Sequence, residues 1–132
     1  LAQGEFILEF RLPPRPPRAS DAYLRLIPRT EMDIAVAGAG VNLVLDAAGV
    51  VTEANVALGA VAPTVLHVAE AGRALVGSKL DEAALAAMEA AARAACRPIS
   101  DKRGTALYRT RIAGVLARRA ALIAYDRAGA RH

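Results

Sequence analysis

The stretch from Val41 to Leu58 constrains the fold most strongly, because two alternating segments flank a turn. The apolar positions on the two sides of the turn follow a period of two: Val41, Leu43, Leu45, Ala54, Val56 and Leu58. This period places one row of side chains on a core face and the other toward water. The linking Asp46-Ala47-Ala48-Gly49 begins with a side-chain acceptor and ends with glycine, as a type I turn prefers. We therefore predict an antiparallel β-hairpin.

The length and composition indicate one domain, perhaps preceded by a tail. The chain has 132 residues, of which 55% are hydrophobic, enough for a core. It contains no apolar run of about 18 residues or more, so we expect no transmembrane segment. Its start at Leu1 resembles neither a signal peptide nor an initiator, and we expect it to come from a longer polypeptide. The lone Cys96 excludes an internal disulfide or an all-cysteine metal site, and a reducing cytoplasmic setting is the default.

The net charge of +4 is divided unevenly along the chain. Residues 1–30 carry five arginines against three acids, and residues 31–92 carry two basic groups against eight acids. Residues 93–132 carry ten basic groups against two acids, a local charge of +8. Such a block suits a nucleic-acid footprint, an interface with an acidic partner or a solvated helix face. Interleaved aromatics and a base-reading motif are lacking, so we expect no nucleic-acid partner.

The first 19 residues form a distinct segment. Apolar residues alternate from Glu5 to Leu12, which predicts a strand. The following Pro13-Pro14-Arg15-Pro16-Pro17-Arg18 lacks the backbone donors of a sheet and favours an extended linker. A proline-rich ligand for a recognition module is the alternative. We place a domain boundary here, with 1–19 as a tail and 20–132 as the main domain.

Two helices are predicted in the middle of the chain, before and after the hairpin. Thr30 can cap a short helix with Glu31 and Asp33 in its first turn, where the helix dipole favours acids. Helical spacing resumes from Val65 to Val76, and glycine at position 77 supplies a left-handed stop.

A further helix opens at Asp81 or Glu82 and ends before Pro98. Its narrow apolar stripe consists of Leu85, Met88, Ala92 and Cys96. We expect the cysteine to be a small buried hydrophobe, with a reactive thiol as the alternative.

The last predicted helix is capped by Ser100, Asp101 or Thr105 and runs to about Tyr125. Its apolar face is expected to contain Tyr108, Ile112, Val115, Leu116 and Ile123. Arg119 falls in the middle of this face, where a guanidinium must be paired or reach solvent. We therefore expect part of the face to meet another protein.

The residues show no self-contained active site. His67 and His132 are far apart, and we expect His67 on a helix surface rather than as a ligand or base. Nucleophile triads, paired-histidine metal motifs and phosphate-binding Gly-Lys-Ser/Thr loops are missing. Gly38-Ala39-Gly40 lacks the third glycine of a dinucleotide loop. The residues alone predict an α+β domain that serves something larger.

Three collinear segments resemble one family. The segment 22–36, Ala-Tyr-Leu-Arg-Leu-Ile-Pro-Arg-Thr-Glu-Met-Asp-Ile-Ala-Val, resembles the opening of the C-terminal domain of the FAD-binding medium subunit of molybdenum hydroxylases. The segment 57–64 is similar to the family's "ALGGVAPT" element, and 98–109 resembles "PISDxRGSAxYR". Residues 112–120 resemble the helix that follows in the family, which includes aerobic carbon monoxide dehydrogenase and xanthine dehydrogenase. The match spans about residues 20–125.

The resemblance implies a three- or four-stranded antiparallel sheet covered by three helices, with residues 4–12 as the last strand of a preceding FAD-binding domain. It implies part of an oxidoreductase subunit that passes electrons from [2Fe–2S] clusters through FAD to an acceptor. FAD would be held mainly by N-terminal domains of the same subunit. The other partners implied are a large molybdopterin subunit and a small iron–sulfur subunit, in a dimer of heterotrimers. We do not expect this chain alone to be catalytically competent.

The resemblance also suggests roles for particular residues. Arg25 corresponds to an often basic position that lies toward the flavin, where it could stabilise charge on the reduced ring. An exposed strand arginine is the alternative. Ala60 replaces a family glycine, and His67 stands where arginine is common. The candidates for structural or subunit contacts are Arg103, Tyr108, Arg109 and Arg119. No catalytic or metal-binding residue is expected, and an assembly domain without cofactor contact is the competing hypothesis.

Overall fold

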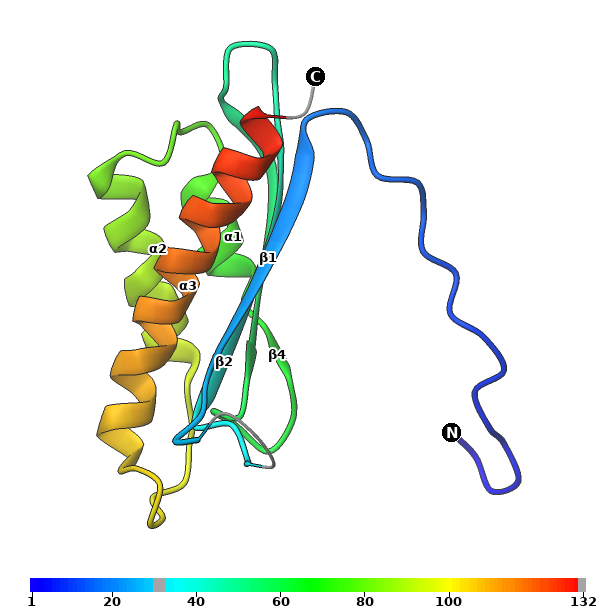
Figure 1. Ribbon diagram of the computed structural model, residues 1–132, viewed down its shortest axis with the longest axis vertical. Helices are drawn as coiled ribbons and strands as arrows, with labels where there is room; N and C mark the ends of the chain where they lie inside the picture. Colours follow the sequence, from blue (N-terminus) through cyan, green and yellow to red (C-terminus); the bar gives the residue numbers. More distant parts are fainter. Residues whose placement is uncertain (30–32, 131–132) are drawn as a thin grey trace.

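The chain folds as a four-stranded antiparallel sheet with three helices on one face (Figure 1). The computed structural model describes residues 1–29 and 33–130. The elements in chain order are β1 (Ala19–Leu26), β2 (Ala37–Leu45), β3 (Val51–Gly59), β4 (Leu66–His67), α1 (Ala69–Leu75), α2 (Glu82–Ala95) and α3 (Ala106–Gly129). The strands lie in the order β1-β2-β3-β4. The predicted α+β fold class is therefore confirmed.

The predicted hairpin is formed by β2 and β3. Val41 lies opposite Val56 and Leu43 opposite Ala54, so the predicted core row shares one face. In the turn, the Asp46 carboxylate accepts hydrogen bonds from two backbone N–H groups, each at 2.8 Å. Gly49 takes a φ of +79°, a conformation that glycine adopts without a steric penalty.

The helices cover the face of the sheet that carries the apolar row. The long α3 crosses β1 and β2, α1 lies on β3, and α2 packs against the other two helices (Figure 1). The largest fully buried side chains are those of Leu43, Leu58, Leu75 and Met88. The core therefore lies between the sheet and its helices, and the opposite sheet face has no helix over it.

The predicted contact face of α3 is wrong. The residues that α3 buries are mainly small: Ala113, Gly114, Ala117, Ala120, Ala121, Ala124 and Ala128, with Arg109 and Leu116. Small side chains let the helix backbone approach the sheet closely, so the larger apolar residues lie at the margins. Arg119 is exposed, and it needs no partner to offset burial.

The strand predicted over residues 5–12 is not formed in this structure. Phe6, Leu8 and Phe10 are 79%, 85% and 82% exposed, and no strand lies beside them. A strand needs a neighbour for its backbone N–H and C=O groups, and within the described chain this segment has none. Residues 13–18 are irregular and largely exposed, and β1 begins at Ala19. The assignment of 1–19 to a preceding domain stays a prediction.

The predicted helix over 65–76 is only partly correct. Leu66 and His67 pair with β3 as β4, and α1 begins at Ala69. The Val68 N–H donates to the Val56 carbonyl at 2.8 Å, which continues this pairing. His67 therefore lies on a strand rather than on a helix surface. The stop at Gly77 is confirmed by its φ of +83°.

The remaining helix boundaries follow the sequence closely. Asp81 caps α2, Thr105 caps α3, and α3 continues to Gly129, beyond the predicted end. The short helix predicted from Thr30 concerns residues 30–32, which lie outside the described residues. Within 1–29 and 33–130, no helix is both long enough and apolar enough to cross a lipid bilayer.

Candidate functional site

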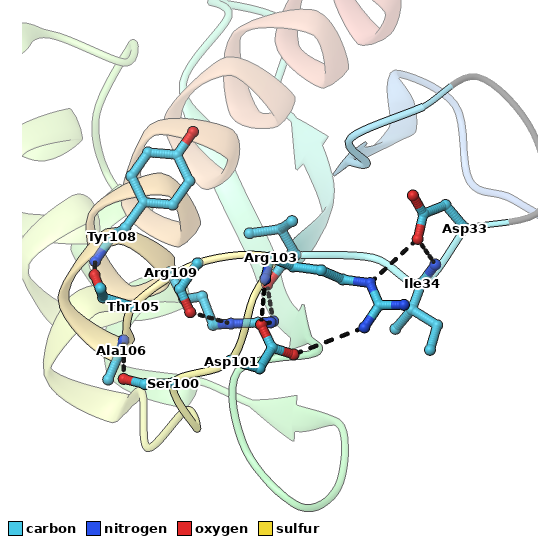
Figure 2. Close-up of polar contacts among 11 residues, drawn as sticks. Asp33, Ile34, Ser100, Asp101, Arg103, Thr105, Ala106, Tyr108 and Arg109 are labelled. Carbon is cyan, nitrogen blue, oxygen red and sulfur yellow. Dashed lines mark hydrogen bonds and ion pairs between the residues drawn. The ribbon is translucent and has the colours of Figure 1, made fainter.

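Three segments that are distant in sequence meet at one end of the sheet. They are residues 33–36, 60–63 and 97–109, and they line a groove of about 480 Å³. Its walls are apolar and its polar groups are the side chains of Arg97, Asp101, Arg103 and Arg109. We call this feature the arginine groove. Figure 2 shows the polar contacts that build it.

Arg109 is the buried centre of this site. Its side chain is 4% exposed, yet it projects from the first turn of α3 into a set of acceptors. Nη1 donates to the Val36 carbonyl at 2.8 Å, and Nη2 donates to Asp101 Oδ1 at 2.7 Å. The guanidinium thereby joins the start of α3 to the segment that enters β2 (Figure 2).

Arg103 connects the same turn to the segment that precedes β2. Its Nε donates to Asp33 Oδ1 at 3.2 Å, and its backbone N–H donates to Asp101 Oδ1 at 2.8 Å. Asp33 also accepts from Arg29 Nε at 3.2 Å and from the Ile34 N–H at 2.8 Å. Two carboxylates thus lie among three guanidiniums. We call Asp33, Asp101, Arg103 and Arg109 the ion-pair network.

The network depends on a well-defined start of α3. The Thr105 hydroxyl accepts from the Tyr108 N–H at 3.1 Å, and Ser100 Oγ accepts from the Ala106 N–H at 2.8 Å. Two of the three predicted cap residues therefore satisfy the helix terminus. Asp101, the third, faces the arginines instead (Figure 2).

The charges of the network shift the acidity of its carboxyl groups. The hydrogen bond from Arg109, followed by the one from the Arg103 backbone, holds the pKa of Asp101 below its ordinary 3.8. For Asp33, the hydrogen bond from the Ile34 N–H contributes most to a lowered pKa, with the side chains of Arg103 and Arg29 adding to it. Both groups are stabilised in the ionised form.

This shift predicts how acid destabilises the domain. Because the folded pKa of Asp101 lies below the unfolded value, its stabilisation is complete above the unfolded value near 3.8 and is lost as pH falls through the folded value. We therefore expect Asp101→Asn to make the unfolding free energy less dependent on pH between about 5 and 2. Urea unfolding at several pH values checks this, with Asp126→Asn on the exposed end of α3 as the control. Equal acid dependence in wild type and Asp101→Asn would contradict it.

Ala60 explains one departure from the family motif noted above. It lines the groove with a φ of +63°, in the left-handed region. A side chain there costs about 1–2 kcal/mol, which glycine avoids. The backbone therefore keeps the shape that suits glycine, although the residue is alanine.

Arg25 lies away from the network. It is exposed near the end of β1, opposite Gly38, on the sheet face that the helices leave open. Within residues 1–29 and 33–130, no carboxylate forms an ion pair with it. Tyr108 and Arg119 are exposed on α3. The structure thus brings Arg103 and Arg109 together and leaves the other three candidates separate.

Cys96 and His67 are explained without chemistry. Cys96 is 6% exposed, its thiol donates to the Ala92 carbonyl at 3.3 Å, and burial raises its pKa, as expected of a buried hydrophobe. His67 is exposed and its Nε2 lies 3.1 Å from Asn55 Oδ1. In the described part of the chain, no group of three or more His, Cys, Asp or Glu side chains could hold a metal ion.

The sequence reasoning missed Asp33 and Asp101 as ion-pair partners. Asp101 could have been found, since the motif that contains it also places arginines two and eight residues later. The pairing of Asp33 with Arg103 spans 70 residues, and no local pattern predicts it.

The comparison with known families decides the assignment. Residues 11–124 match the family model of the CO dehydrogenase flavoprotein C-terminal domain. The chain belongs to this family. The match includes β1 to β4 and most of α3, and it confirms the resemblance drawn from the three motifs.

Characterised members of the family are similar over nearly the whole chain. The carbon monoxide dehydrogenase medium chain of Afipia carboxidovorans is 44% identical over 117 residues, which cover 89% of this chain and 40% of that protein. The medium chain from Hydrogenophaga pseudoflava is 36% identical over 128 residues, 96% of this chain and 44% of that protein. The chain thus spans about two fifths of the length of these relatives.

Solved structures show the same fold. Reconstituted CO dehydrogenase from Oligotropha carboxidovorans superposes with a TM-score of 0.83 at 41% identity, covering 88% of this chain and 40% of that chain. Quinoline 2-oxidoreductase from Pseudomonas putida 86 gives a TM-score of 0.77 at 28% identity, covering 85% of this chain and 39% of that chain. The α+β fold is therefore shared by enzymes named for different substrates.

Proposed function

We propose that this chain is the C-terminal part of the FAD-binding subunit of a cytoplasmic, molybdenum-containing hydroxylase. In that subunit it flanks the flavin and supports assembly with a molybdopterin subunit and an iron–sulfur subunit. The observation that carries the proposal is the similarity to carbon monoxide dehydrogenase medium chains along 89% and 96% of this chain. The substrate of the complex is not part of the proposal, because the chain itself holds no substrate site that the family match identifies.

The residues fit a marginal contact with FAD rather than its enclosure. In the described chain, Gly38 and Gly40 lie within a regular strand and form no nucleotide-binding loop. The arginine groove is lined mainly by apolar residues, and its buried Arg109 already donates to protein acceptors. Arg25, in contrast, is exposed on the open sheet face with no ion-pair partner among the described residues. It is the residue of this chain that could meet a flavin held by a neighbouring domain.

A guanidinium at the flavin edge would act electrostatically. Bound FAD supplies the electron-transfer chemistry, and its ring gains negative charge on reduction. Arg25 carries a fixed positive charge that favours the charged form, more strongly where water is excluded. The role of Arg25 is therefore to bind and to tune, and no proton transfer or bond formation is assigned to it.

The competing candidate is an assembly domain without cofactor contact. It is favoured by the composition of the exposed α3 surface, which carries Arg111, Arg119 and Tyr108. Arginine and tyrosine are enriched at protein interfaces. The two candidates agree on the partners of this chain and differ only in what Arg25 does.

A flavin titration tests the proposal. We expect the full-length subunit to bind FAD and this chain alone to bind none that absorbance detects, since it lacks a nucleotide-binding loop among its described residues. In the full-length subunit, Arg25→Gln is expected to weaken FAD binding about five- to tenfold and to lower the flavin reduction potential.

The matched control is Arg111→Gln, which removes an exposed arginine from α3 and should leave both values unchanged. No FAD binding by the full-length subunit, even with its partner subunits, would refute the flavoprotein assignment. Unchanged affinity and potential in Arg25→Gln would leave the assembly role in its place.

A further inference from the structure

The sheet face that the helices leave open has the composition of an interface. The side chains that it carries near its centre are Tyr23 from β1, Asn42 from β2, Asn55 and Ala57 from β3 and His67 from β4. Solvated sheet faces are usually rich in charged residues. Near the middle of this face the residues are neutral or small, and tyrosine is a residue that protein interfaces favour.

The floor of the face is flat because two glycines lie under an aromatic ring. A Cβ built on Gly38 would lie 2.7 Å from the Tyr23 hydroxyl, and one on Gly40 would lie 3.7 Å from the ring. The ring therefore rests across β2, although Tyr23 is 63% exposed. Beside it is a shallow hollow of about 220 Å³ with Asn42, Asn55 and Ala57 in its lining. Another surface can approach this sheet closely.

The N-terminal arm, residues 1–18, runs on the same side of the sheet. In Figure 1 the helices lie to the left of the sheet and the arm lies to its right. An ion pair between Arg15 and Asp21 joins the arm to the open face of β1. The arm also carries the exposed Phe6, Leu8 and Phe10. Apolar residues are therefore exposed on this side of the molecule along the route by which the chain enters the fold.

The length of the relatives indicates what enters by that route. The family is a C-terminal domain, and this chain covers 40% and 44% of two relatives. In a subunit of that length, most of the polypeptide precedes the domain and reaches it through the arm. The arm delivers that polypeptide to the open face and not to the helices.

We propose that the open sheet face is the docking surface for the preceding, flavin-binding part of the same subunit. The contact places Tyr23, Asn42 and Asn55 at its centre and buries the apolar side chains of the arm at its margin. This inference rests on the proposed function for the nature of the occupant. It goes beyond it because it assigns the surface, and it sets the helical face free for other subunits.

Cysteine labelling of the full-length subunit tests the docking surface. Asn42→Cys places a thiol in the centre of the open face, and Ala87→Cys places one on α2; both positions are exposed in this structure. We expect maleimide to label the first at least about tenfold more slowly than the second, because a thiol must be accessible to react. Cys96 serves as the internal buried reference, and mass spectrometry of each peptide gives the rates.

Each outcome of this experiment decides the inference. Equal labelling of the two positions in a folded subunit overturns it, and so does protection that arises only after the partner subunits are added. Asn55→Cys repeats the test if Asn42→Cys fails to fold. FAD content is measured on the same wild-type subunit, so a subunit that lacks FAD but protects the open face separates a failed flavin assignment from a failed docking surface.

Discussion

Gly72→Ala is expected to lower the free energy of unfolding of this chain by about 3 kcal/mol, although alanine is the better helix former. Gly72 lies in α1 where the helix crosses β3, and a Cβ at this position would lie 2.4 Å from the Ala54 carbonyl oxygen. The clashing atom belongs to backbone that pairs with Leu43 in the centre of the sheet, so it cannot move without straining the ladder. The helix must move away instead, which opens the core around Leu75.

Gly114→Ala is the matched control for this prediction. Its Cβ would lie 2.8 Å from Arg93 Nε and 2.9 Å from Glu89 Cγ, atoms of side chains and not of backbone. The Arg93 side chain is 42% exposed and can change its rotamer, and the gain in helix propensity of about 1 kcal/mol offsets much of the cost. We expect a change of less than about 1 kcal/mol. Urea unfolding followed by circular dichroism measures both variants, and a loss of equal size in the two would contradict the argument.

The sequence predicts the parts of this fold whose cause is local. The period of two between Val41 and Leu58, the turn at Asp46 and the left-handed stop at Gly77 each depend on a few adjacent residues, and the structure confirms them. The caps at Asp81 and Thr105 are likewise local, because a side-chain oxygen meets an N–H three residues later.

The sequence fails where a neighbour in space decides the outcome. Leu66 and His67 carry a helix-compatible pattern, but pairing with Ala57 and Leu58 makes them a strand. On α3 the large apolar residues were expected to face the core, yet the alanines do, because the sheet accepts a closely packed helix. The segment 5–12 has the right pattern for a strand and has no neighbour to pair with in this chain.

The candidate site was predictable as a motif and not as a geometry. The run from Pro98 to Arg109 indicated the family, and two of its arginines were singled out as contact residues. The distances show that Arg109 makes structural contacts within this chain, since its donors reach Val36 and Asp101. Which residues contact a partner subunit stays a prediction.

Arg109→Met is expected to lower the free energy of unfolding by about 2–4 kcal/mol. Methionine fills part of the buried volume, so the loss comes mainly from acceptors that the guanidinium now satisfies. The Val36 carbonyl loses its bond of 2.8 Å, and the Asp101 carboxylate loses one of 2.7 Å. The Asp101 side chain is 29% exposed and regains some water, which places the expected value below that of a fully buried pair.

Two further variants separate the role of the fork from that of the charge. Arg109→Lys keeps the charge but cannot donate to both acceptors at once, so it should recover less than half of the loss. Arg111→Met, two residues along α3 and exposed, should change the stability by less than about 0.5 kcal/mol. If Arg109→Met were as stable as Arg111→Met, the link between α3 and the segment that enters β2 would contribute nothing. Since that segment leads directly from Asp33 into the centre of the sheet, a measured loss in Arg109→Met would show that the ion-pair network anchors this end of the fold.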